Sequence, residues 1–305
     1  MTAHDLPLGC FGKLPFWPEY LEFGVSYATS RALKAFLLAG RSELEGREEV
    51  PANSRVVQGI RFVIALPASV ELLVGYLRPS TDLGGLRRFP FAVFVHLPRR
   101  SYGRHFRLLP TGLDGVWNLL EDAWSSVAEL ASEAGFREAI AATRVPMPRS
   151  PGEARAIYEA ALDRDMEGLF AGHVGARVDG LPGGLRELIS RLKSAKGAAQ
   201  LTVELPVSAG IEEATADTSV WLDLLGRQFW RMRIEPSFFL DARPQCPGRG
   251  LILRFGELEP RDFPLLFGLR DEADGVLRPA EAPPAAGTTP PAGTRRNLVS
   301  WRIGG

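Results

Sequence analysis

The sequence has no excess of charge of either sign, because 36 lysines and arginines balance 36 aspartates and glutamates. A protein that holds a phosphate backbone needs a basic field, so we do not expect nucleic acid as a partner. Long hydrophobic runs are missing as well. The apolar stretches at residues 62–66 and 89–95 fall well short of the roughly 18 residues that a membrane-spanning helix requires. We therefore expect no membrane span.

Cysteine is scarce, with only Cys10 and Cys246 in the chain. Two distant cysteines cannot build a zinc site by themselves. They are compatible with a structural disulfide or, in a reducing cytosol, with two buried free thiols. Residues 6–10 resemble the end of a lipoprotein signal, but the short segment before Cys10 contains charge and no apolar core. We therefore expect a cytoplasmic protein.

Catalytic and metal-binding signatures are also missing. The sequence has no phosphate-binding loop, no Gly-x-Ser-x-Gly turn and no Gly-x-Gly-x-x-Gly segment after a strand. Residues 190–193 fit Ser-x-x-Lys but lack the companion motifs of serine acyl-enzymes. The acidic residues at 163–167 alternate, so a helix would point them to different faces, and the four histidines lack metal-ligand spacing. We expect no catalysis, no metal and no cofactor.

The hydrophobic pattern predicts an α/β protein with a single mixed β-sheet flanked by helices, in a layered α/β/α arrangement. Strand-like apolar runs occupy residues 8–14, 56–66, 70–77, 89–97, 201–207, 237–240 and 250–255. Helical spacing covers residues 27–44, 116–130, 152–170, 185–192 and 261–269, the second of these after a turn at 112–115. We expect one domain over residues 1–278. Residues 279–305, rich in Pro, Ala, Gly and Thr, are predicted to form a disordered tail.

The first unusual segment is Gly-Cys-Phe-Gly-Lys-Leu-Pro at residues 9–15, followed by an aromatic cluster at 16–20. Two glycines weaken a strand unless another element approaches closely, and the lysine is expected to emerge at the strand end. Either the aromatic rings form a partly exposed recognition edge, or the loop plugs the core with them. The candidate partner-binding residues are Lys13, Trp17, Glu19 and Tyr20, with Gly12 and Pro15 as structural positions.

The second unusual segment is the turn-rich connection at residues 78–90. Its serine and aspartate are suited to bonding nearby backbone amides, and its paired glycines permit left-handed turns. An aspartate–arginine pair here would staple the loop, or an arginine would offer its guanidinium to a partner's carboxylate or phosphate. The candidate partner-binding residues are Asp82, Arg87 and Arg88, and the structural positions are Ser80, Gly84, Phe89 and Pro90.

Together the two segments resemble the TagF/ImpM family of type VI secretion-associated proteins. Residues 11–15 match that family's opening Phe-Gly-Lys-Leu-Pro, and Pro18-Glu19-Tyr20 stands where Gly-Asp-Phe is expected. The second motif is matched, with one extra residue between Asp82 and Phe89, by Pro79, Ser80, Asp82, Arg87, Phe89 and Pro90. Residues 219–221 and 260–266 extend the resemblance, which covers about residues 8–270.

The resemblance implies a cytoplasmic, non-catalytic regulator of type VI secretion. Such a regulator acts by binding another protein, which in some members of the family is a forkhead-associated scaffold. Two alternatives remain open. One is an enzyme or small-anion-binding protein with a site around Asp82, Arg87 and Lys13. The other is a passive structural adaptor in which both motifs serve only packing.

Overall fold

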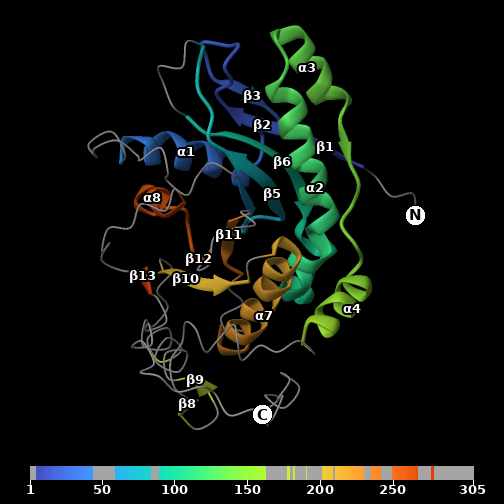
Figure 1. Cartoon of the computed structure of the whole chain (residues 1–305), viewed down its shortest axis with the longest axis vertical. Coiled ribbons are helices and arrows are strands. Elements are labelled where there is room, and N and C mark those ends of the chain that lie inside the picture. Colours follow the sequence, from blue (N-terminus) through green and yellow to red (C-terminus); the bar gives the residue numbers. More distant parts are fainter. Residues whose placement is uncertain are drawn as a thin grey trace.

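The fold is built on one mixed sheet, seen in a computed structural model of the chain (Figure 1). The structure describes residues 5–43, 59–83, 89–162, 177–178, 181–182, 190, 201–208, 210–229, 235–241, 249–266 and 276–277. Nine strands within these ranges form the sheet in the order β13-β10-β12-β11-β4-β5-β6-β2-β3. Strand β13 runs parallel to β10, whereas the other neighbours are antiparallel. The predicted mixed sheet is therefore confirmed.

The strands of this sheet are β2 (Gly9–Gly12), β3 (Leu21–Phe23), β4 (Ile60–Ile64), β5 (Glu71–Arg78), β6 (Phe91–Pro98), β10 (Leu201–Val207), β11 (Ser237–Asp241), β12 (Arg249–Phe255) and β13 (Val276–Leu277). Two small antiparallel pairs lie outside it: β1 (Leu6–Pro7) with β7 (Arg144–Val145), and β8 (Arg177–Val178) with β9 (Leu181–Pro182).

Helices cover both faces of the sheet. They are α1 (Ala28–Ser42), α2 (Leu109–Ala128), α3 (Glu133–Ala142), α4 (Pro151–Leu162), α7 (Ile211–Phe229) and α8 (Phe263–Leu266), with 3-10 turns η2 (Arg99–Ser101), η3 (Gly103–Leu108) and η5 (Pro260–Asp262). One core cluster joins the sheet to α2, α3, α4 and α7, and a second joins it to α1 and α8. Figure 1 shows α1 and α8 close together, away from α2 and α7. The predicted α/β/α layering is therefore confirmed.

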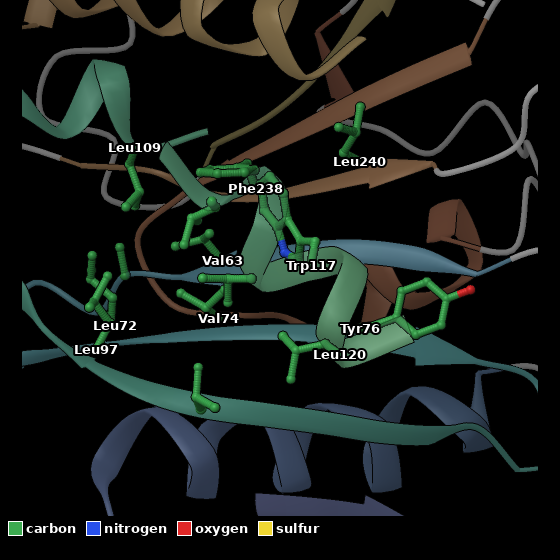
Figure 2. Close-up of a cluster of buried hydrophobic side chains, with 14 of the residues drawn as sticks. Val63, Leu72, Val74, Tyr76, Leu97, Leu109, Trp117, Leu120, Phe238 and Leu240 are labelled. Atoms are coloured by element: carbon green, nitrogen blue, oxygen red, sulfur yellow. The ribbon is translucent and has the colours of Figure 1, made fainter. Parts of the chain in front are cut away.

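The centre of the larger core is Trp117 on α2, which is fully buried (Figure 2). Its indole meets the ring of Phe238 edge-on, with 6.2 Å between the ring centroids. Val63 and Val74, on the adjacent strands β4 and β5, lie beneath it. Because strands buried on both faces need no polar side, they appear in the sequence as the nearly continuous apolar runs described above.

Helix α2 begins earlier than the sequence pattern predicts. The expected turn at residues 112–115 is wrong, because both Gly112 and Gly115 lie inside the helix. Gly112 faces Tyr102, whose hydroxyl occupies the space of a side chain: a Cβ on this glycine would lie 2.7 Å from Cζ of the tyrosine and collide with its oxygen. The glycine therefore marks a close approach inside a helix rather than a turn.

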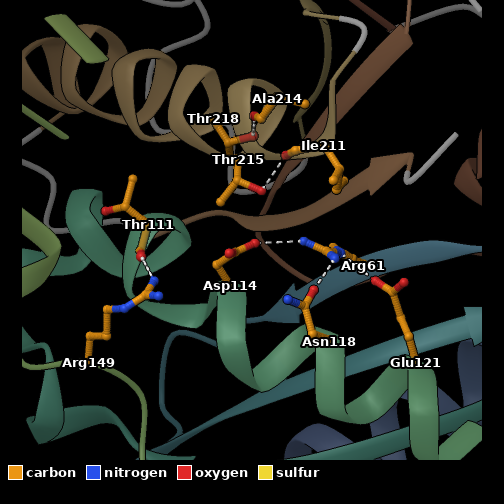
Figure 3. Close-up of polar contacts among 10 residues, drawn as sticks. All are labelled: Arg61, Thr111, Asp114, Asn118, Glu121, Arg149, Ile211, Ala214, Thr215 and Thr218. Atoms are coloured by element: carbon orange, nitrogen blue, oxygen red, sulfur yellow. Dashed lines mark hydrogen bonds and ion pairs between the residues drawn. The ribbon is translucent and has the colours of Figure 1, made fainter. Parts of the chain in front are cut away.

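Helix α7 was not predicted at all. Its middle contains threonine, serine and aspartate, which are poor helix formers because they compete for backbone hydrogen bonds. In the structure, Thr215 and Thr218 donate to the carbonyls of Ile211 and Ala214, each at 2.8 Å and one turn earlier (Figure 3). Burial of Trp221, which donates to the Pro206 carbonyl at 2.7 Å, holds the helix against the sheet. Packing thus overrides local propensity.

Several other expectations concern particular segments. Cys10 is a free, buried thiol, and its burial raises the pKa of the sulfur strongly, so it stays protonated. Cys246, the predicted helix at 185–192 and the predicted tail at 279–305 lie outside the described residues, apart from Ser190. Within the described ranges, no helix combines the length and apolar character needed to cross a bilayer.

Candidate functional site

The two unusual segments of the sequence meet at one end of the sheet. Strand β2 pairs with β6 and β3, and Lys13 follows directly after it. The Lys13 ammonium lies 3.7 Å from the carboxylate of Asp82, which comes from the second segment. The ammonium also donates a hydrogen bond of 2.6 Å to the Pro18 carbonyl. We call this place the motif junction; it comprises Phe11, Gly12, Lys13, Tyr20, Asp82 and Phe89.

Three aromatic rings pack together at the motif junction, and one of them contacts the lysine. Phe11 stacks on Tyr20, with 5.7 Å between centroids and 9° between planes. Phe89 meets both rings edge-on, at 6.0 Å and 4.9 Å. The Lys13 ammonium lies 4.9 Å from the centroid of the Tyr20 ring, within range of a cation–π attraction. The Asp82 carboxylate, the Pro18 carbonyl and the Tyr20 ring thus compensate for the loss of water around the buried ammonium.

Gly12 permits the two segments to approach so closely. Its φ angle of 141° falls where side chains are disfavoured. A Cβ built there would lie 2.7 Å from the Cα of Phe91 and closer still to the Pro90 carbonyl oxygen. In the second segment, the Phe89 amide donates to the Ser80 carbonyl at 3.0 Å, which brings the ends of the loop together. The structure therefore gives packing roles to the glycine and to the loop ends.

The candidate residues differ in how far the structure exposes them. The expectation that Lys13 emerges from the strand end is wrong: it is 1% exposed, because residues 15–20 fold back over it. Trp17 is half-buried against the larger core, whereas Pro15, Glu19 and Tyr20 are exposed. The candidates Arg87, Arg88 and Gly84 lie outside the described residues.

An exposed rim borders the buried motif junction, and we define it as Glu19, Tyr20 and Leu83. Tyr20 is 37% exposed and Leu83, next to the buried Asp82, is 57% exposed. Two large side chains thus remain accessible directly beside the buried motif junction. The rim combines one acidic, one aromatic and one aliphatic side chain.

A second polar centre, which the sequence analysis missed, surrounds Arg61 on β4 (Figure 3). Its guanidinium donates to Asp114 at 3.1 Å, Asn118 at 2.8 Å and Glu121 at 2.6 Å, all on α2. The arginine is 2% exposed and lies over the Trp117 indole, 5.6 Å from the ring. The signal in the sequence is the i, i+4, i+7 spacing of the three polar residues beside the apolar stripe of α2. This cluster clamps the helix to the sheet.

A second buried arginine, Arg254, lies on the other face of the sheet. Arg254 of β12 donates to the Thr202 hydroxyl at 2.9 Å and pairs with Glu259 at 2.7 Å and Asp262 at 3.3 Å. Burial raises the pKa of Asp262, while the hydrogen bond from Thr202 and the charge of Arg254 act in the opposite direction. The cluster holds η5 and the following α8 against the sheet. Like the Arg61 cluster, it engages its charges internally.

Comparison with known proteins gives a match to the part of the chain that contains the motif junction. Residues 9–143 match the model of the TagF N-terminal domain, which is described as type VI secretion system-associated. Residues 9–143 thus form a TagF N-terminal domain. The resemblance of the two segments to this family is confirmed over the matched range, which contains the whole motif junction.

The TagF N-terminal domain contributes β2 to β6, α1, α2 and α3, whereas α4, α7 and strands β10 to β13 lie beyond it. The two parts share the sheet, since β11 pairs with β4. Protein PA0076 from Pseudomonas aeruginosa PAO1, known from a crystal structure at 2.05 Å resolution, is 27% identical over 47% of this chain, with a TM-score of 0.38. The match spans 65% of that protein, less than two thirds of its length. A search of curated proteins finds no match.

Proposed function

We propose that this type VI secretion-associated protein is a non-catalytic, cytoplasmic regulator that binds a protein partner through the rim of the motif junction. The observation that carries the proposal is the buried ion pair of Lys13 and Asp82. It joins the two family motifs and leaves Glu19, Tyr20 and Leu83 accessible beside it. A rigid base under exposed aromatic and aliphatic side chains favours binding, because little side-chain order is lost when a partner arrives.

The internal engagement of the charged groups also supports a non-catalytic role. An enzyme with its site around Lys13 and Asp82 needs at least one of them in contact with substrate. The ammonium instead faces a carboxylate, a backbone carbonyl and an aromatic ring, and its side chain is 2% exposed. The partner we propose is the one that the family resemblance implies, a forkhead-associated scaffold protein of the secretion system.

The experiment compares two variants, each of which introduces a glutamate beyond one end of β5. Leu83→Glu changes the rim, whereas Val70→Glu changes an apolar residue that is 80% exposed just before the strand. Binding of the purified scaffold protein is measured by calorimetry for both variants and for the unmodified chain. We expect Leu83→Glu to weaken binding by at least about tenfold, because a buried unpaired carboxylate is costly at an interface. Val70→Glu should bind like the unmodified chain.

Each alternative has its own signature in this experiment. If both variants bind equally well, the rim is not the contact. If the unmodified chain does not bind the scaffold protein, the proposed partner is wrong. A passive adaptor predicts that Leu83→Glu lowers the melting temperature together with binding, whereas the proposal predicts melting temperatures like that of the unmodified chain for both variants.

A further inference from the structure

A basic surface lies at the other end of β6 from the motif junction. Residues 99–107, between β6 and α2, contain four arginines and one histidine and no acidic residue. Of these side chains, Arg100, Arg104 and Arg107 are exposed. The concentration of charge stands out because the chain as a whole has a formal net charge of zero.

Helix α4 adds a further arginine to this surface. The Arg104 side chain contacts the His105 ring, with 3.4 Å between Nε and Nε2. Burial and then the positive charges of Arg104, Arg155 and Arg107 lower the pKa of His105. The exposed Arg155 of α4 therefore belongs to the same positive field. The guanidinium groups of Arg104, Arg107 and Arg155 gather where η3 and α4 pack against each other, and Arg100 lies on η2, just before η3 in the chain.

The elements under this surface are tied to one another. The Tyr102 hydroxyl donates to the Arg149 carbonyl at 2.5 Å, just before α4, and the Arg149 guanidinium reaches the Thr111 carbonyl at 3.3 Å (Figure 3). On α7, the buried Asp223 accepts a hydrogen bond of 2.9 Å from Tyr158 and pairs with Arg107 at 3.3 Å. The charges are therefore presented by a fixed platform.

Most of the positive charge on this platform has no ion-pair partner within the part of the chain that the structure describes. Arg99 pairs with Glu235 and Arg107 with Asp223. Arg100, Arg104 and Arg155, in contrast, form no ion pair with any residue that the structure describes.

We propose that the basic surface of Arg100, Arg104, His105, Arg107 and Arg155 binds an acidic segment of a partner protein. Guanidinium groups pair with carboxylates through two parallel hydrogen bonds, which suits clustered aspartates and glutamates. Nucleic acid fits less well, because binders of single strands add exposed aromatic rings for the bases, and Tyr102 and Phe106 are buried.

This surface is independent of the rim. Gly12 at the motif junction pairs with Phe91, the first residue of β6, whereas η2 follows Pro98, the last. At about 3.3 Å per residue, the strand separates the two places by roughly 23 Å. The basic surface is therefore a second contact site, and its test does not depend on the rim.

The test uses a fluorescein-labelled peptide of ten glutamates and measures its anisotropy with the full chain at low salt. The double variant Arg104→Glu/Arg155→Glu replaces two positive charges of the basic surface with negative ones. Arg31→Glu/Arg144→Glu is its matched control, because it changes the net charge equally at two other exposed arginines, on α1 and β7. We expect the double variant to lose at least about tenfold in affinity and the control less than about threefold. Binding should also weaken as sodium chloride is raised.

Three results would overturn the proposal. The first is that the unmodified chain does not bind the peptide. The second is that the control loses as much affinity as the double variant, which would show a general charge effect. The third is that a labelled DNA oligonucleotide, or vesicles of anionic lipid, bind the same surface more tightly than the peptide, which would assign it to a different class of partner.

Discussion

Lys13 and Asp82 form a buried ion pair, with 3.7 Å between the ammonium nitrogen and the nearer carboxylate oxygen. The two residues come from different family motifs, and each buried charge is balanced by the charge of the other motif. Removing one partner of a buried pair leaves an uncompensated charge in the interior, which is far more costly than the pair is stabilising. The stability of the fold and the arrangement of the rim therefore depend on the same contact.

The first prediction follows from this pair. Lys13→Met should lower the free energy of unfolding by about 3 kcal/mol, because it leaves the Asp82 carboxylate buried without its ammonium. Lys34→Met is the control: Lys34 pairs with Glu22, but the two side chains are 35% and 40% exposed, so the loss should stay below about 1 kcal/mol. Urea denaturation followed by circular dichroism measures both.

The same measurement on the double variant Lys13→Met/Asp82→Leu tests the cause. Because an apolar pair of similar volume needs no desolvation of charge, much of the stability should return. A double variant as unstable as Lys13→Met would contradict this explanation, and so would equal losses in Lys13→Met and Lys34→Met.

The second prediction compares two glycines. Gly12→Ala should destabilise the protein by at least about 2 kcal/mol, because the new Cβ meets backbone atoms of Pro90 and Phe91 and the φ angle of 141° is unfavourable. Gly115→Ala, inside α2 with nothing within 4 Å of its Cβ, should stabilise by about 1 kcal/mol. Thermal denaturation of both variants distinguishes them; a neutral Gly12→Ala would mean that β2 and β6 can separate without cost.

The third prediction concerns pH and His96. Its Nε2 lies 3.2 Å from the Gly24 carbonyl, and Nδ1 is buried without a hydrogen-bond partner among the described residues. Tyr27 and Phe94 face the ring, at 4.4 Å and 5.6 Å. Burial lowers the pKa of His96 in the folded protein, although the Gly24 carbonyl and the negative charge of Glu71 oppose the shift.

Since the unfolded chain binds this proton more readily, the contribution of His96 to stability is complete well above about pH 6.5 and declines as the pH falls through and below that value. Unfolding free energies at pH 5, 6 and 7 should therefore decrease less towards acid in His96→Gln than in the unmodified chain. An imidazole that titrates above pH 6.5 in an NMR experiment on the folded protein would refute the prediction.

The sequence predicted the parts of the fold that depend on local apolar periodicity. Strands β4, β5 and β6 and helix α1 lie where their hydrophobic runs and stripes place them, because burial of those side chains is the main driving force. Helix α7 was not predicted because its threonines and serine lower the local helix propensity. Only packing against the sheet compensates for this low propensity.

The sequence by itself also determined the family motifs and the close approach that two glycines in a short strand require. It could not determine where the charges of those motifs lie. Lys13 is buried because a second segment supplies a carboxylate and its own turn supplies a carbonyl, and both depend on how distant parts of the chain pack. Arg61 is buried for the same reason, under three polar side chains of α2. The environment of a charge is set by its neighbours in space, so only the tertiary structure decides it.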